Sequence, residues 1–140
     1  MGLLGNLFGK DDMPELGSEV PVYSTIQGFQ KHLKVLTENI PGDMELVPYE
    51  DKVYVFIGKP PKQFGFAWID DKYVNNLIGV AKEKGISKED LGKISEDLRQ
   101  TYIKNKDSMQ KYIWNADDAR MIVNVSDGLG QQLKTIVDNI

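Results

Sequence analysis

The chain has 140 residues, a length typical of one globular domain, and it contains no cysteine and a single histidine, His32. The missing cysteines exclude disulfides, thiol nucleophiles and cysteine-ligated metal sites, and one histidine excludes sites that need two. A net charge of −4 with only two arginines, Arg99 and Arg120, argues against a nucleic-acid partner and against arginine clamps for phosphate.

Residues 1–21 are expected to form a flexible N-terminal tail, because glycine and proline recur there between short apolar patches. The tail includes Leu3, Leu4, Leu7 and Phe8, which could dock in a partner's groove, on their own domain or on a second copy. It lacks the basic start of a signal peptide, and no apolar run approaches the ~20 residues that cross a bilayer. We therefore expect a cytoplasmic protein with no membrane span.

Residues 22–140 are expected to form a single globular domain that begins with a helix. Ser24-Thr25-Ile26-Gln27 fits a capping box, in which Ser24 accepts from the first turn and Gln27 reaches back. From Ile26 to Ile40, apolar side chains recur at three- and four-residue spacing, which predicts one helix face. Pro41-Gly42 should end this helix.

Residues 44–69 predict an antiparallel meander of three strands, 44–47, 53–57 and 64–69, joined by short connections. The strand at 53–57 is β-branched and aromatic throughout, a composition typical of strands. Asp70-Asp71 should then open a helix that Gly85 ends, because acidic residues both cap a helix and complement its dipole. A further helix is predicted from Ser87 to about residue 104.

The last third of the chain has two interpretations. Residues 112–114 and 121–125 could form a hairpin, followed by a C-terminal helix capped by Ser126 or Asp127, or the whole segment could be mostly helical. Gly128 and Gly130 favour the hairpin, because each would weaken a continuous helix by about 1 kcal/mol. The sequence thus predicts an α+β fold: a mainly antiparallel sheet, built from the meander and the hairpin, with about four helices packed on it.

The main candidate site is an aromatic face of the meander. Strand alternation places Phe64, Phe66 and Trp68 on one face, and Tyr54 and Phe56 point away from the aliphatic set of their own strand. An uncovered face of this kind would suit a partner or ligand, whereas helices on both faces would make it core. The predicted binding residues are this face and three charged residues beside it: Tyr54, Phe56, Phe64, Phe66, Trp68, Lys59, Asp70 and Asp71.

Four other features each allow a structural and a functional interpretation. Asp70-Asp71 could hold Mg²⁺ or act as acid and base, or simply cap a helix. Asp117-Asp118 has the same two interpretations, with a turn favoured. His32 lies beside an apolar helix face and is expected to be half packed. Gly128-Leu129-Gly130 is half of a phosphate-binding loop but lacks the remaining motif residues. No cofactor, metal site or catalytic residue is therefore assigned.

Three functional hypotheses follow. The leading one is a non-enzymatic cytoplasmic interaction or accessory protein that binds a protein partner or itself, as a homo-oligomer, through the aromatic face and the apolar tail. The second is a small carboxylate-based enzyme in which Asp70, Asp71, Tyr54 and Lys59, with His32 as an optional further member, converge at one end of the sheet. The third is a small-molecule sensor with a pocket between sheet and helices.

Overall fold

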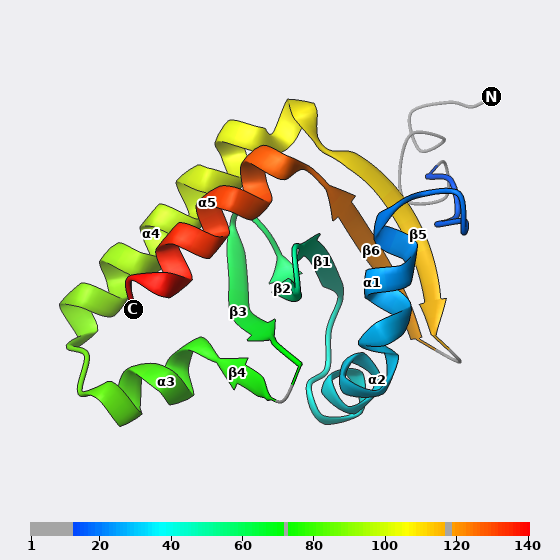
Figure 1. The fold of residues 1–140 in the computed structure, drawn as a ribbon. Helices are drawn as coiled ribbons and strands as arrows, with labels where there is room; N and C mark the ends of the chain where they lie inside the picture. Colours follow the sequence, from blue (N-terminus) through cyan, green and yellow to red (C-terminus); the bar gives the residue numbers. More distant parts are fainter. Residues whose placement is uncertain (1–12, 72, 117–118) are drawn as a thin grey trace.

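The computed structural model describes residues 13–71, 73–116 and 119–140. Its centre is a six-stranded sheet with the strand order β4-β3-β2-β1-β6-β5, shown in Figure 1. The strands are β1 (Met44–Tyr49), β2 (Lys52–Lys59), β3 (Gln63–Ile69), β4 (Val74–Asn76), β5 (Gln110–Ala116) and β6 (Ala119–Val125). The helices are α1 (Val22–Gly28), α2 (Gln30–Asn39), α3 (Leu77–Lys84), α4 (Lys88–Asn105), the 3₁₀ turn η3 (Lys106–Ser108) and α5 (Asp127–Asp138).

The predicted α+β class is confirmed, and so are the meander, the C-terminal hairpin and the helix after it. β1, β2, β3 and β4 pair antiparallel in sequence order, as do β5 and β6. The sheet is not a simple meander, because β1 and β6 pair in parallel, with Glu45 opposite Ile122 and Leu46 opposite Val123. This parallel pair joins the N-terminal meander to the C-terminal hairpin in one sheet.

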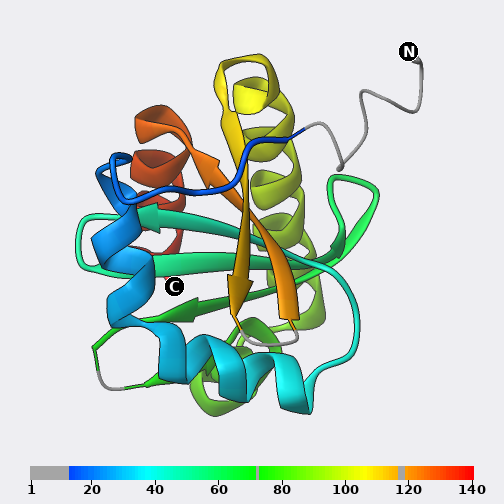
Figure 2. The ribbon, with the colours of Figure 1, turned by 90° about the vertical axis from the view of Figure 1, so that its right-hand side faces the viewer.

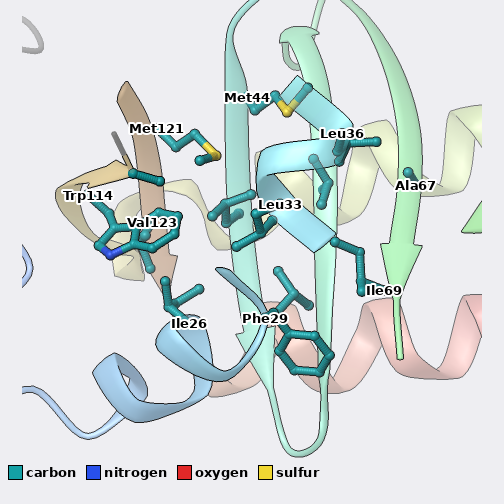
Figure 3. Close-up of a cluster of buried hydrophobic side chains, with 14 of the residues drawn as sticks. Ile26, Phe29, Leu33, Leu36, Met44, Ala67, Ile69, Trp114, Met121 and Val123 are labelled. Atoms are coloured by element: carbon teal, nitrogen blue, oxygen red, sulfur yellow. The ribbon is translucent and has the colours of Figure 1, made fainter. Parts of the chain in front are cut away.

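Helices cover both faces of the sheet. Helices α1 and α2 cover one face, where Ile26, Leu33 and Leu36 pack on aliphatic strand residues (Figures 2 and 3). Helices α4 and α5 cover the other face, where Leu98, Leu129 and Leu133 pack on the meander. Since adjacent strand residues point to opposite faces, each central strand supplies both clusters and is buried on both sides.

The first helix differs from the prediction. The segment expected as one helix forms two, α1 and α2, with Phe29 between them at φ −103° and ψ 10°. Ser24 lies inside α1 and does not cap it; its hydroxyl donates to the Pro21 carbonyl at 3.5 Å. Gly28 weakens a helix by about 1 kcal/mol, and the break turns the Phe29 ring into the core.

The segment after β3 also differs, because Asp70 closes a turn and does not open a helix. Its carboxylate accepts from the Tyr73 N–H at 2.8 Å, and its own N–H donates to the Tyr73 carbonyl at 3.1 Å. The chain then forms the short strand β4 before α3 begins. The Asn76 side chain caps α3 by accepting from the N–H groups of Ile78 and Gly79. Asp favours turns as readily as helix caps, so local sequence did not separate the two.

Part of the predicted N-terminal tail is attached to the sheet. The Leu16 N–H donates to the Ile113 carbonyl at 2.8 Å, and the Ile113 N–H donates to the Pro14 carbonyl at the same distance. Glu15 thereby bridges β5 in parallel, and the Leu16 side chain is buried in the core. Residues 14–16 therefore protect the β5 edge. The remaining tail residues 1–12, like the predicted Asp117-Asp118 turn, lie outside the described part of the chain.

Helix α5 begins with two glycines because it packs closely. A Cβ on Gly130 would lie 2.5 Å from the Tyr49 ring, and one on Gly128 would lie 2.9 Å from Asn105 Oδ1. Ser126 caps the helix by accepting from the Leu129 N–H at 3.2 Å. These contacts explain Gly128-Leu129-Gly130 without a phosphate. Within the three described ranges, no helix is both long and apolar enough to cross a bilayer.

Candidate functional site

The aromatic face of the meander is core and not an exposed surface. Tyr54, Phe56, Phe66 and Trp68 are buried against α4 and α5. The Phe56 ring makes edge-on contacts with Phe66 and with Tyr102 of α4, at centroid distances of 5.2 and 5.3 Å. The expectation of an uncovered face is therefore corrected. The apolar faces of α4 and α5 are as unfavourable in water as the aromatic face of the strands. The helices and the strands therefore pack together, and both surfaces are buried.

Phe64 is half-buried at the margin of this face. The Arg99 guanidinium lies 5.7 Å from its ring centroid and donates to the Pro61 and Lys62 carbonyls at 2.7 and 3.2 Å. Arg99 also pairs with Glu96 at 2.7 Å. This cation thus holds the β2–β3 loop on α4 and is engaged in structural contacts.

The charged residues predicted to accompany the aromatic face do not converge. Lys59 pairs with Gln63 at one end of the β2–β3 ladder, and Asp70 follows Ile69 at the other end. Six residue steps of about 3.3 Å place these ends roughly 20 Å apart. Asp71 is exposed in the turn after β3. The arrangement required for a carboxylate enzyme with Lys59 and Asp70 at one end of the sheet is absent from the described structure, and we do not propose it.

Tyr54 and His32 each hold a buried polar atom with no hydrogen-bond partner among the described residues, the Tyr54 hydroxyl and the His32 Nδ1. Burial raises the pKa of the Tyr54 phenol well above its usual range, and the carboxylate of Asp138 adds to this shift. His32 packs edge-on against Phe29 at a centroid distance of 6.2 Å and is half-buried, as its place beside an apolar helix face suggested.

The structure assembles a polar cluster that the sequence did not reveal. One oxygen of the Glu45 carboxylate accepts from the Tyr102 hydroxyl at 2.8 Å, the Lys111 ammonium at 3.0 Å and the Asn124 amide at 2.9 Å. The Lys111 ammonium also donates to Asn124 Oδ1 at 2.8 Å and to the Tyr102 oxygen at 3.3 Å. We call these four residues the polar cluster. It ties α4 to β1, β5 and β6.

The polar cluster is largely shielded from solvent and its members satisfy one another. The Lys111 and Glu45 side chains are 27% and 13% exposed, and Asn124 and Tyr102 are buried. Burial raises the pKa of Tyr102 above its usual range, and the Glu45 charge raises it further. Because Lys111 has three donors and meets three acceptors, its hydrogen-bonding capacity is used inside the cluster. This geometry fixes strand positions and leaves little capacity for a substrate.

A shallow cleft of about 780 Å³ opens between α2 and the β5–β6 hairpin. Met44, Met121 and Ala116 form an apolar, buried floor. The remaining lining residues are Lys34, Thr37, Glu38, Gly42, Ala119 and Arg120, so the rim carries both signs of charge. The cleft lies between sheet and helix, where a ligand-binding protein often holds its ligand.

An apolar patch lies at the opposite edge of the sheet. The Tyr73, Val74 and Ile78 side chains are 65%, 38% and 57% exposed, and we call these three residues the edge patch. Of five large apolar side chains exposed in the described ranges, these three lie within six consecutive positions, whereas Val35 and Ile103 are separate. Scattered exposed apolar residues are ordinary. Val74 pairs with Ile69 and so lies on the α1/α2 side of the sheet, whereas Ile78 lines a pocket on the α4 side.

A small pocket of about 150 Å³ adjoins the edge patch where β4 ends and α3 begins. We call it the edge pocket. Its lining is mainly apolar and consists of Phe64, Gly65, Phe66, Asn76, Leu77, Ile78, Leu91 and Ser95. β4 pairs with β3 only at residues 67–69, so residues 63–66 of β3 pair with β2 alone within the described part of the chain. The edge pocket therefore lies beside an uncovered stretch of strand.

The sequence indicated neither the polar cluster nor the edge patch. Glu45 and Asn124 are polar residues at positions facing the core, a signal that strand alternation could have given. The edge patch had no such signal, because Val74 and Ile78 both fall in the helix predicted between Asp70 and Gly85, where apolar residues at this spacing are expected to face the core. Comparisons with protein-family models, with curated proteins and with solved structures found no match.

Proposed function

We propose that this chain is a non-catalytic interaction protein that binds a protein partner or a second copy at the edge patch and edge pocket. The observation that carries this proposal is the exposed Ile78 side chain at the wall of a mainly apolar pocket, with Tyr73 and Val74 also exposed a few residues earlier in the chain. Hot spots of protein interfaces combine such a pocket with an apolar anchor from the partner. The edge pocket is of a size to take one aliphatic or aromatic side chain.

The neighbouring strand edge supports the same function. An extended segment beside residues 63–66 of β3 could add backbone hydrogen bonds to the sheet, as in β-augmentation. Gly65 is exposed there, and no side chain on that residue hinders a neighbouring strand. Main-chain pairing would supply affinity, and the edge pocket would supply the preference for an apolar side chain.

The proposal is tested by selecting peptides from a random 12-residue display library on the full chain. We expect selected peptides to share a large apolar residue and to lose at least tenfold in affinity against Ile78→Asp. Val35→Asp is the matched control, because Val35 is 52% exposed and lies on α2, away from the edge patch. Peptides that bind both variants as well as the original chain would contradict the proposal.

A second function is favoured by the cleft beside α2. Its volume of about 780 Å³ lies within the range of roughly 300–1,000 Å³ typical of ligand sites, and its floor is apolar. We propose small-molecule binding there as the alternative. A fragment library screened by thermal shift should give hits that Ala119→Trp abolishes by filling the cleft. Hits that persist in that variant would place the binding elsewhere.

A further inference from the structure

We propose that the partner at the edge pocket is an extended peptide segment of another protein, with an apolar side chain for the pocket and an acidic residue for Lys59 and Lys62. This inference rests on the proposed function, since it names the class of partner for the same surface. It is carried by the hydrogen-bonding direction of β3, by the side of the sheet on which the edge pocket lies, and by the charge of the β2–β3 loop.

The backbone of Phe64 and Phe66 faces the uncovered edge of β3. Successive residues of a strand direct their N–H and C=O groups alternately to its two sides. Directly after β3, the Asp70 N–H donates toward β4, to the Tyr73 carbonyl at 3.1 Å, so the even-numbered residues of β3 face the same way. β4 pairs only with residues 67–69, which leaves Phe64 and Phe66 without a neighbouring strand on that side in the described ranges. Each therefore offers one N–H donor and one C=O acceptor to an added strand.

The edge pocket lies on the side of the sheet to which an added strand would direct every second side chain. Phe64 and Phe66 point toward α4, and Leu91 and Ser95 of that helix also line the pocket. Side chains directly opposite each other on paired strands point to the same face. The peptide residues opposite Phe64 and Phe66 therefore point toward α4, and a pocket of about 150 Å³ holds one large apolar side chain. The peptide residue between them points away from the pocket.

The end of this edge is positively charged. Lys59 and Lys62 are exposed, and neither ammonium group forms an ion pair with a carboxylate of residues 13–71, 73–116 or 119–140. Lys62 directly precedes β3, and Lys59 pairs with Gln63 across the β2–β3 ladder. A peptide residue beside Gln63 would lie two strand spacings, roughly 10 Å, from Lys59, which lysine and glutamate side chains can span together. An acidic residue close to the apolar anchor would thus have both lysines within reach.

A second copy does not have this combination at its own β3 edge. Residues 59–66 include two lysines and no carboxylate, so two copies paired edge to edge would bring together four ammonium groups and no acidic partner. Like charges disfavour such a contact, whereas a peptide that carries a glutamate or an aspartate is attracted. The charge of this edge therefore favours a separate acidic peptide over a second β3 edge.

The first measurement uses a 12-residue peptide, selected on the full chain, whose binding Ile78→Asp weakens. The peptide is synthesised as a series in which a single backbone nitrogen carries a methyl group, which removes that N–H donor. We expect methylation at every second nitrogen around the apolar anchor to lower the affinity at least tenfold, and methylation at the nitrogens between to lower it less than twofold. The anchor's own nitrogen is sensitive if the peptide runs antiparallel to β3, and its neighbours' nitrogens are sensitive if it runs parallel. Either alternation supports the inference.

The second measurement tests the charge of the edge with the same peptide. Lys59→Glu/Lys62→Glu should lower the affinity at least fivefold at low salt and less at high salt, because salt screens exposed charges. Lys31→Glu is the matched control, because Lys31 is exposed on α2 at the other face of the sheet, and it should change the affinity less than twofold. Equal affinities for the original chain and for Lys59→Glu/Lys62→Glu would overturn the inference.

Three outcomes separate this inference from the proposed function. Peptides that depend on Ile78 but show no alternation on methylation would overturn the inference and still support the edge pocket as a binding surface. A Leu3→Asp/Leu7→Asp/Phe8→Asp chain that binds the peptide at least tenfold more tightly than the original chain would mean that this chain's own N-terminal segment competes for the site, which would also overturn the inference. If no selected peptide depends on Ile78, both proposals fail.

Discussion

Two regions of this molecule reverse the usual distribution of side chains. The polar cluster places a carboxylate, an ammonium, a phenol and an amide inside the fold, between the sheet and α4. The edge patch places three large apolar side chains on the surface beside β4. A buried polar group and an exposed apolar cluster are both more informative than a single exposed leucine. Each is unfavourable in free energy, so each calls for an explanation beyond ordinary folding.

The difference between the two regions lies in where their partners are. Every residue of the polar cluster is hydrogen-bonded to at least two other members, so the cluster finds its partners within one chain. In the described structure no helix or strand covers the edge patch, and no side chain of the chain fills the adjoining edge pocket. We therefore expect the polar cluster to contribute to stability, and the edge patch remains our proposed binding surface. Substitutions in the two regions should then affect different measurements.

The largest effect is expected for Lys111→Met. Removing the ammonium leaves the mostly buried Glu45 carboxylate without its counter-charge, and breaking a buried pair in this way costs about 3–5 kcal/mol. Because Lys111 is partly exposed, we expect a loss of about 2–3 kcal/mol in the free energy of unfolding, measured by urea denaturation. The control is Lys93→Met, whose pair with Glu89 is exposed at 3.9 Å and should contribute little. Equal losses in both variants would mean that the buried Lys111–Glu45 pair contributes no more to stability than an exposed pair.

A smaller effect is expected at alkaline pH. The pKa of Tyr102 is raised in the folded chain by burial and by Glu45, whereas an unfolded tyrosine titrates near 10. The unfolded chain therefore loses this proton first, and folding stability should be complete below pH 10 and fall above it. Near pH 11 the loss should be about 1 kcal/mol for this phenol. Urea denaturation of the original chain and of Tyr102→Phe from pH 9 to 11 isolates the contribution of this phenol, because the two chains differ only in the Tyr102 hydroxyl. If the free energies of unfolding of the two chains changed in parallel with pH, Tyr102 would not contribute to the loss of stability at alkaline pH.

The smallest effect on stability is expected in the edge patch. Ile78→Asp should change the free energy of unfolding by no more than about 0.5 kcal/mol, because the side chain is mostly exposed and the new charge lies at a helix N-terminus. Urea denaturation of a monomeric sample checks this. A loss comparable to that of Lys111→Met would show that Ile78 belongs to the core and that its effect on association is indirect.

The sequence alone determined the class of fold and most of its elements. These elements were indicated by local signals, which a sequence carries most reliably. The signals include the β-branched and aromatic run at 53–57, the turn residues of the meander, and Gly85 at the end of a helix. Ser126 and the glycines after it likewise separated the hairpin from a continuous helix. Asp70 and Ser24 were misassigned because the same residue types favour turns, caps and helix starts alike.

Only the tertiary structure decided which surfaces are covered. The aromatic face was read correctly as a face, but whether α4 and α5 lie on it depends on contacts between segments distant in sequence. The polar cluster depends on the same kind of contact, since Glu45 meets Asn124 and Lys111 only through the parallel pairing of β1 and β6. Periodicity shows that a side of an element is apolar; it does not show what that side packs against. In this chain that second fact separates the core from the exposed surface.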